Sequence, residues 1–278
     1  THSGGFMHDS IGVAEQVLTD NGRKYGFTVT CYRFTGDPDA TVVAETKDPT
    51  TGAPTKTKTT AFQEYAERLR KTTGLVLDRE HCGRVNKETL RKFDAVLFFT
   101  TGEPLTKEEL ADLTGWVRDG GAFAGTHCAT DTLYPRRDAP QNAAYGELVG
   151  AYFAGHPWTQ KVRLKVEDPN HPAARGFKTG DEIKDEIYVF RDAPFSREKL
   201  HVILSLDNAS VDLSKGNRAD RDYAVSWCRQ YGKGRSFYTS LGHFKEVWTD
   251  QRFQQHLFGG LRWAVGLDPG DATPSGKR

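Results

Sequence analysis

Alternating apolar and polar stretches predict a chain of strands and helices in alternation. Residues 94–101 are apolar in the middle and polar at both ends, which is typical of a strand inside a parallel sheet. Residues 106–109 (Thr-Lys-Glu-Glu) predict an N-cap and an acidic first turn, and apolar positions then recur at helical spacing up to a Gly-Gly turn at 120–121. A second apolar strand follows at 121–125. This order predicts parallel pairing with a right-handed crossover.

Further helices and strands are predicted on either side of this unit. Residues 10–20, 60–71 and 253–264 each place apolar residues on one helical face. Residues 27–32 look like an early strand. The second half contains five strand-like segments, separated by loops rich in Pro, Gly and Asp. We expect them to extend the sheet, in part antiparallel; they are 162–166, 185–190, 200–206, 224–228 and 235–239.

The two ends and one internal segment depart from this pattern. Residues 1–6 resemble the loop after a strand, so we expect a strand, with or without a signal peptide ahead of it, to precede Thr1. Residues 35–60 have no period and are rich in Gly, Pro, Asp, Thr and Lys, which predicts a long exposed loop or insertion. We expect one domain over 1–266 and a frayed tail over 267–278.

Composition excludes several partners. The 278 residues include 38 basic and 37 acidic side chains, and the resulting net charge of +1 is too small to attract nucleic acid or an anionic membrane. No apolar run approaches the ~18 residues of a membrane span. The four cysteines show no zinc-type spacing and leave the redox compartment open. The sequence is thus compatible with the cytoplasm or, if a signal peptide was removed, with the periplasm or secretion.

The exit from the strand at 121–125 carries the first chemical signal. Residues 125–129 read Gly-Thr-His-Cys-Ala, and such sharp exits display catalytic groups in α/β proteins. The equivalent elbow of class I glutamine amidotransferases reads Gly-x-Cys-x-Gly, with a cysteine nucleophile. His127 stands at that position here, and Cys128 points to another side. An imidazole binds metals or shuttles protons but replaces a thiolate poorly, so we do not expect glutamine hydrolysis.

Other histidines occupy comparable places. His8 and His243 each follow an inferred strand, so they are expected beside His127 at the carboxyl edge of the sheet, where ligands bind. His156 lies in a nearby loop. Two interpretations follow: His127 and His243 act as acid and base, or the four histidines bind a divalent metal such as Zn²⁺. The alternative is that all are hydrogen-bonded loop residues.

Carboxylates and aromatic rings extend this candidate site. Glu186 and Tyr188 share one face of a predicted strand, opposite Ile187, and we expect that face to line the cleft, with Glu186 in catalysis. The alternative is a solvated strand end. Asp131 follows His127 by four positions and is a candidate for substrate binding. Aromatic rings stack on sugars, and the candidates near loops are Tyr188, Trp158, Trp227 and Trp248. Asp9 is expected to cap the helix that begins near Ser10, and the alternative is that it orients His8.

The order of these motifs resembles the trehalose-utilisation (ThuA-like) family, a branch of the class I glutamine amidotransferase-like fold. The matching segments are GGFMHDS (4–10), GGAFAGTH (120–127), YGELVG (145–150), FAGHP (153–157), HP (171–172), DEIY (185–188), GKGR (232–235) and LGH (241–243). The resemblance covers nearly the whole chain except residues 35–90.

The resemblance implies a three-layer, flavodoxin-like α/β core with a mainly parallel sheet. It also implies a role in sugar catabolism, beside dehydrogenases that make 3-keto-glycosides. We therefore expect an enzyme acting on a glycoside or 3-keto-glycoside, or alternatively a non-catalytic carbohydrate-binding protein that uses the same cleft. Residues 35–90 depart from the compact family pattern and have two interpretations, a lid or a contact in a homo-oligomer.

Overall fold

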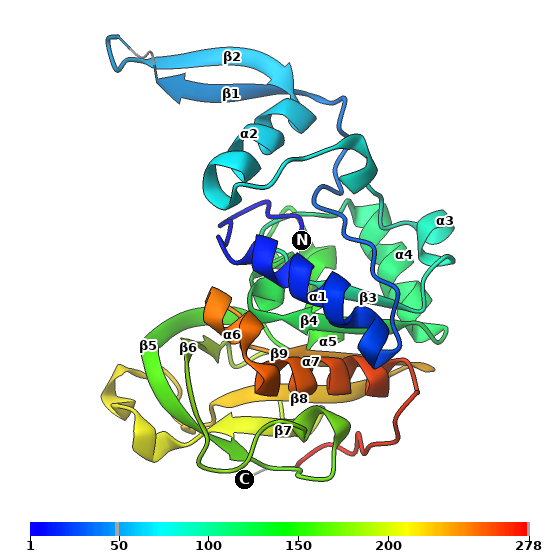
Figure 1. The fold of residues 1–278 in the computed structure, drawn as a ribbon, viewed down its shortest axis with the longest axis vertical. Helices are drawn as coiled ribbons and strands as arrows, with labels where there is room; N and C mark the ends of the chain where they lie inside the picture. Colours follow the sequence, from blue (N-terminus) through cyan, green and yellow to red (C-terminus); the bar gives the residue numbers. More distant parts are fainter. Residues whose placement is uncertain (48–49, 277–278) are drawn as a thin grey trace.

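A mixed sheet of seven strands forms the centre of the molecule (Figure 1). This computed structural model describes residues 1–47 and 50–276. The strands lie in the order β3-β4-β9-β8-β7-β5-β6. Their bounds are β3 (Ala95–Phe98), β4 (Ala122–Thr126), β5 (Phe153–Val166), β6 (Glu182–Phe190), β7 (His201–Leu206), β8 (Ala224–Tyr231) and β9 (Gly234–Thr239). Strands β3, β4 and β9 pair parallel, and the other neighbours pair antiparallel. The α/β class and the added strands of the second half are confirmed.

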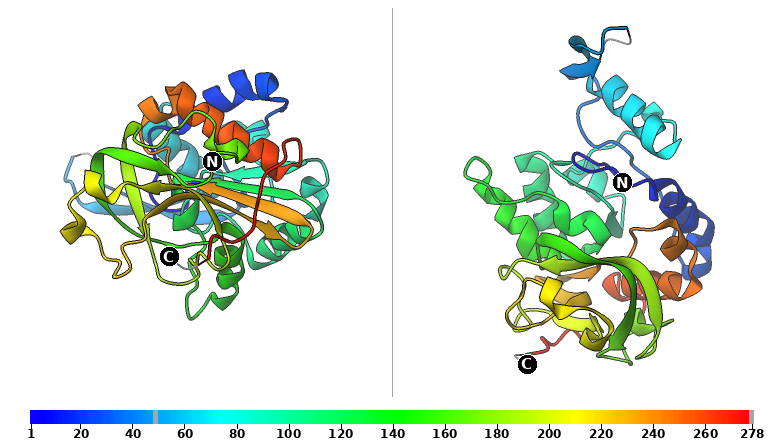
Figure 2. Two further views of the ribbon diagram at one scale, coloured as in Figure 1. Left: turned by 90° about the horizontal axis from the view of Figure 1, so that it is seen from below. Right: turned by 90° about the vertical axis from the view of Figure 1, so that its left-hand side faces the viewer.

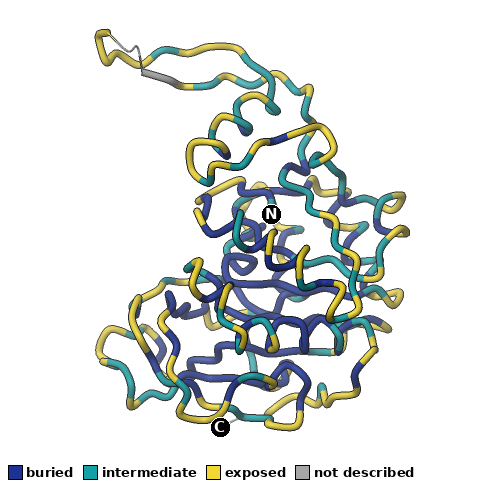
Figure 3. The backbone as a smooth tube through the Cα atoms, viewed as in Figure 1, coloured by how far each residue is buried: buried dark blue, intermediate teal, exposed yellow. Residues whose placement is uncertain are grey.

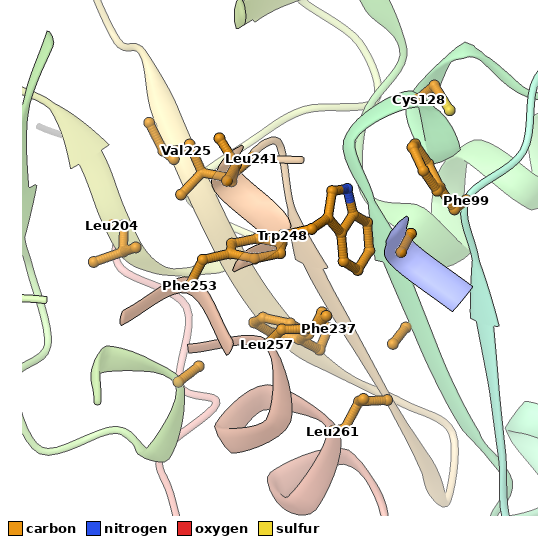
Figure 4. Packing of buried hydrophobic residues seen from close by; sticks show 14 of the residues in the cluster. Phe99, Cys128, Leu204, Val225, Phe237, Leu241, Trp248, Phe253, Leu257 and Leu261 are labelled. Atoms are coloured by element: carbon orange, nitrogen blue, oxygen red, sulfur yellow. The ribbon is translucent and has the colours of Figure 1, made fainter. Parts of the chain in front are cut away.

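Helices cover both faces of this sheet and complete the three layers (Figure 2). One face carries α1 (Ile11–Tyr25), α6 (Lys245–Thr249) and α7 (Gln251–Ala264); the other carries α4 (Lys107–Arg118) and α5 (Ala143–Val149). Each face has its own cluster of buried apolar side chains. On the first face, Phe237 of β9 lies beside Leu257 of α7, and Leu261 of the same helix belongs to the same cluster (Figure 4). Burial of each such side chain contributes about 1.5–3 kcal/mol.

Helix α4 begins where the sequence predicts. The Thr106 hydroxyl accepts the backbone N–H of Glu109, and the Glu109 carboxylate accepts the backbone N–H of Thr106, which makes a capping box. The helix ends before Gly121, where a Cβ would lie 2.5 Å from the ring of Trp116. The following chain can therefore turn tightly into β4, which delivers the elbow to its place.

Strand β3 lies at the edge of the described sheet, although its sequence predicts an interior strand. Residues 27–32 run beside it without strand structure, so the strand predicted there is wrong. A cavity of about 180 Å³, lined by side chains of both segments, lies between them. No backbone hydrogen bond joins the two segments in the described chain. Consequently Ala95, Val96 and Leu97 are only half-buried. The elbow strand, for which the sequence predicts a place near the centre of the sheet, is β4 and lies one place in from the edge.

Residues 41–47 and 54–60 pair as a two-stranded hairpin that projects from the body (Figure 1). Strand β1 (Thr41–Lys47) pairs antiparallel with β2 (Pro54–Thr60), so the loop predicted over these two stretches is wrong. Figure 3 shows that the hairpin is exposed or half-buried along its described length. Thr60 ends β2 and caps α2 (Ala61–Thr73), and the short α3 (Lys87–Leu90) follows. A role of residues 35–90 as a lid or an oligomer contact stays a prediction.

The described part of the tail has no helix or strand, but it is not frayed. The backbone N–H of Ser275 donates to the carbonyl of Leu200, and that of Gly276 donates to the carbonyl of Arg197. These bonds hold residues 275–276 beside the start of β7. Among all described residues, no helix is both long enough and apolar enough to cross a membrane.

Candidate functional site

Four side chains from separate parts of the chain converge at the carboxyl ends of β4 and β9. They are His8, His127, Glu186 and His243, and one ligand atom from each lies within 4.8 Å of the others. His243 Nδ1 lies 3.2 Å from both His127 Nε2 and Glu186 Oε2. The His8 ring centroid lies 4.9 Å from that of His127 and 5.1 Å from that of His243. The structure thus assembles these predicted residues, while their catalytic or metal-binding roles stay predictions.

The elbow holds His127 in a strained and buried position. His127 has φ 44°, in the left-handed region, which costs a residue with a side chain on the order of 1–3 kcal/mol. Gly125 permits the turn, because a Cβ there would lie 2.9 Å from that of Ala129. His127 Nδ1 lies 2.8 Å from the carbonyl oxygen of Ser240. A carbonyl only accepts, so Nδ1 carries a proton, and Nε2 is the ring atom that faces the cluster.

Glu186 connects the cluster to a fifth residue. Its Oε2 faces His127 and His243, while its Oε1 lies 3.3 Å from Nδ1 of the half-exposed His156. Burial opposes the charge of Glu186, but its hydrogen bonds with His127 and His243 outweigh burial and lower its pKa. Burial likewise opposes protonation of His243, yet Glu186 raises the pKa of that imidazole. Glu186 is therefore the anionic centre of the site.

His8 has the donor properties of a metal ligand. Burial, followed by the neighbouring His127 and His243, lowers the pKa of His8 to about 2, so its imidazole is neutral. Its Nδ1 is buried and has no hydrogen-bond partner in the described chain. Three imidazoles and one carboxylate form a donor set that suits Zn²⁺. The residues present therefore fit a divalent metal.

Asp185 supports the site from behind, a role that the sequence analysis missed. Its buried carboxylate accepts the backbone N–H groups of Gly242 and His243 at 2.7 and 3.1 Å, and that of Glu186 at 2.9 Å. It thereby fixes the turn that carries His243. The available signal was a pair of adjacent acids directly before the apolar run 187–190, since a carboxylate buried there needs several donors.

Tyr188 lies on the same strand face as Glu186, as the alternation predicts. Its ring centroid is 4.2 Å from that of His127 and 4.3 Å from that of Phe153. The ring is 4% exposed, so it packs behind the elbow histidine. A direct contact of Tyr188 with substrate stays a prediction.

The three tryptophans expected to stack on sugars are core residues instead. Trp158, Trp227 and Trp248 are each at most 1% exposed. Their indole N–H groups donate to backbone carbonyls, and Trp248 bonds to Gly242 beneath the histidine turn. Figure 4 shows Trp248 among the buried rings that include Phe253. Buried rings of this kind offer no face to a ligand, so the sugar-platform prediction is wrong for all three.

Two other candidates, Asp131 and Asp9, lie outside the four-residue cluster. The half-buried Asp131 lies beside Tyr134, and its carboxyl makes no hydrogen bond or ion pair with the four-residue cluster in the described chain. Asp9 pairs with Lys245 at 2.9 Å and does not cap α1, because that helix has Ser10 at its N-cap without a side-chain bond.

Cys128 is buried beside the elbow, and burial raises the pKa of its thiol. This agrees with the expectation that it is no nucleophile.

Comparison with known proteins agrees with this architecture. A family model described as trehalose utilisation (ThuA) matches residues 39–264. A ThuA-like protein from Parabacteroides merdae aligns over 98% of this chain and 93% of its own, with a TM-score of 0.58 and 15% identity. A ThuA-like protein from Bacteroides uniformis aligns over 73% and 82%, with a TM-score of 0.52 and 22% identity. These two likenesses show the fold. No curated protein matches the sequence.

Proposed function

Because the chain belongs to the ThuA (trehalose utilisation) family, we propose that it is a metal-dependent enzyme of sugar catabolism. Its substrate is a glycoside or 3-keto-glycoside, and its reaction takes place at His8, His127, Glu186 and His243. One observation carries the proposal: three imidazoles and a carboxylate converge within 4.8 Å at the sheet edge where α/β proteins bind ligands.

The protein's own contacts orient these residues as ligands. His127 donates from Nδ1 to Ser240, an arrangement that commonly fixes a metal-bound histidine through its second nitrogen. Since Nε2 lies inside the cluster, His127 has no free ring atom for a substrate proton. The geometry therefore favours the ligand role of His127 over its acid/base role. A divalent ion bound here would supply Lewis-acid polarisation of a substrate carbonyl oxygen.

His156 is the residue that we assign to proton transfer. Glu186 Oε1 holds its Nδ1 at 3.3 Å, and its side chain is 49% exposed, so Nε2 stays available to substrate or water. A carboxylate that orients an imidazole in this way is the usual support of a histidine base. In a 3-keto-glycoside the C–H next to the carbonyl is acidic, and His156 would take that proton.

The proposal is tested by turnover of 3-keto-trehalose and trehalose before and after dialysis against a chelator. We expect chelation to abolish turnover and zinc to restore it. His127→Ala should lower zinc affinity and kcat together, because it removes a metal ligand. A folded protein that binds both sugars but turns over neither would favour the carbohydrate-binding alternative. Turnover that survives complete metal removal would contradict the metal site.

A further inference from the structure

A cavity of about 470 Å³ opens beside the cluster. His8 and His243 form part of its wall, and the N-terminal loop and helix α2 form the rest; the residues from these two segments are Gly5, Phe6, Met7, Asp9, Arg68 and Thr72. Its volume falls in the range of about 300–1,000 Å³ that is usual for small-molecule sites. The cavity thus gives a small molecule direct access to two of the four clustered residues.

Phe6 stands out in this wall because it is exposed. Its side chain is 66% accessible, and the other large apolar residues with comparable exposure in the described chain are aliphatic: Val43, Val76 and Leu267. The Phe6 ring lies edge-on to His8, with centroids 4.8 Å apart. A phenyl ring left in water gains nothing for the core, so its place at the mouth of a cavity points to a ligand.

The backbone around Phe6 is fixed from two sides. The Phe6 carbonyl accepts the Thr101 hydroxyl at 2.8 Å, and the Gly4 N–H donates to the Thr101 carbonyl at 2.8 Å. Gly4 has no room for a side chain, since a Cβ would lie 3.0 Å from the Glu103 nitrogen. A ring on such an anchored loop is held in place before a ligand arrives, which lowers the entropy cost of binding.

Arg68 fixes the same loop from helix α2. Its guanidinium donates to the carbonyls of Ser3 and Gly5, and its Nε is buried without a hydrogen-bond partner in the described chain. Thr72, one turn further along α2, also faces the cavity. The wall therefore combines one aromatic face with several polar groups, which is the composition expected of a site for a hydroxylated ring.

We propose that Phe6 is a specificity-determining residue that stacks on the apolar face of a pyranoside ring, with Arg68 and Thr72 beside the hydroxyls. This inference rests on the proposed function and names its substrate class. It also assigns the platform that the buried tryptophans cannot provide. Helix α2, within residues 35–90, thereby becomes one wall of the substrate site.

The test uses the full chain loaded with zinc and measures binding of trehalose and 3-keto-trehalose by calorimetry. Phe6→Ala should weaken sugar binding by roughly two- to tenfold, the range for loss of one aromatic contact. Phe6→Trp should retain or strengthen binding. Val76→Ala removes an equally exposed apolar side chain outside the cavity and should change nothing. Zinc affinity should be the same in all variants, because Phe6 is not a ligand.

The outcomes separate this inference from the proposed function. If the wild-type protein turns over the sugar and Phe6→Ala keeps the wild-type sugar affinity and KM, the Phe6 subsite is wrong and the proposed function stands. Sugar binding that depends on Phe6 in a protein without turnover would support the subsite and refute the enzyme. A zinc-loaded wild type that binds neither sugar would overturn both.

Discussion

The carboxylate of Asp185 offers the sharpest test of how the site is built. Asp185 is completely buried and accepts three backbone N–H groups, of which those of Gly242 and His243 belong to the turn that carries a cluster residue. We consider the substitution Asp185→Asn. It keeps the shape of the side chain, removes its charge and replaces one acceptor oxygen with an NH₂ donor.

The expected loss of unfolding free energy follows from the individual hydrogen bonds of Asp185. An asparagine oxygen at the Oδ1 position can still accept from Glu186 and His243, but its NH₂ group then faces the N–H of Gly242. Leaving that buried donor unsatisfied costs about 1–3 kcal/mol. Asp185→Ala leaves all three donors without the side chain, so at about 1–3 kcal/mol for each donor its cost should be roughly 3–9 kcal/mol. Because His243 loses its anchor, zinc affinity should also fall, by about 10–100-fold.

Two measurements check this prediction. Urea unfolding of the metal-free variants gives the change in unfolding free energy, and competition with a chromophoric chelator gives zinc affinity. Asp212→Asn is the matched control, because Asp212 also accepts a backbone N–H, that of Ser214, but is exposed. If Asp185→Asn kept the wild-type urea midpoint and wild-type zinc affinity, the idea that this carboxylate positions His243 would be refuted.

Three further outcomes are expected. Thr106→Ala should lower the unfolding free energy by about 1 kcal/mol through loss of the α4 capping box, and an unchanged urea midpoint would argue against that cap. Burial lowers the pKa of His256 to about 4, below the ordinary 6.5, so the unfolded chain takes up this proton first. The free energy of unfolding therefore carries the full contribution of neutral His256 above pH 6.5 and loses roughly 3 kcal/mol as the pH falls to 4. His256→Asn should make the free energy of unfolding from urea titrations less dependent on pH between 6.5 and 4. An unchanged dependence in this range would contradict the argument. His156→Gln should lower kcat on 3-keto-trehalose by roughly 10²–10⁴-fold at unchanged zinc affinity, whereas weakened zinc binding would instead make it a ligand.

Local patterns were sufficient for the four longest helices and for most strands of the central sheet, but not for the short helices α3, α5 and α6. The cap at Thr106 and the apolar spacing after it predict α4, because capping and helical periodicity depend on residues within a few positions of one another. The alternation around Ile187 placed Glu186 and Tyr188 on one face for the same reason. The elbow motif likewise predicted that His127 is displayed at the end of a strand, because five consecutive residues, 125–129, form the turn.

Long-range packing decided the rest of the site. His127 and His243 are separated by 116 positions, and only the parallel pairing of β4 with β9 brings their rings together.

The sequence does not show which tryptophans are buried, because any aromatic residue near a loop can point inward or outward. Nor does it show that Asp185 faces a distant turn, that β3 lies at a sheet edge, or that Phe6 remains exposed beside His8. Burial and hydrogen-bond partners depend on surfaces contributed by segments far apart in the chain, and those surfaces exist only once the chain has folded.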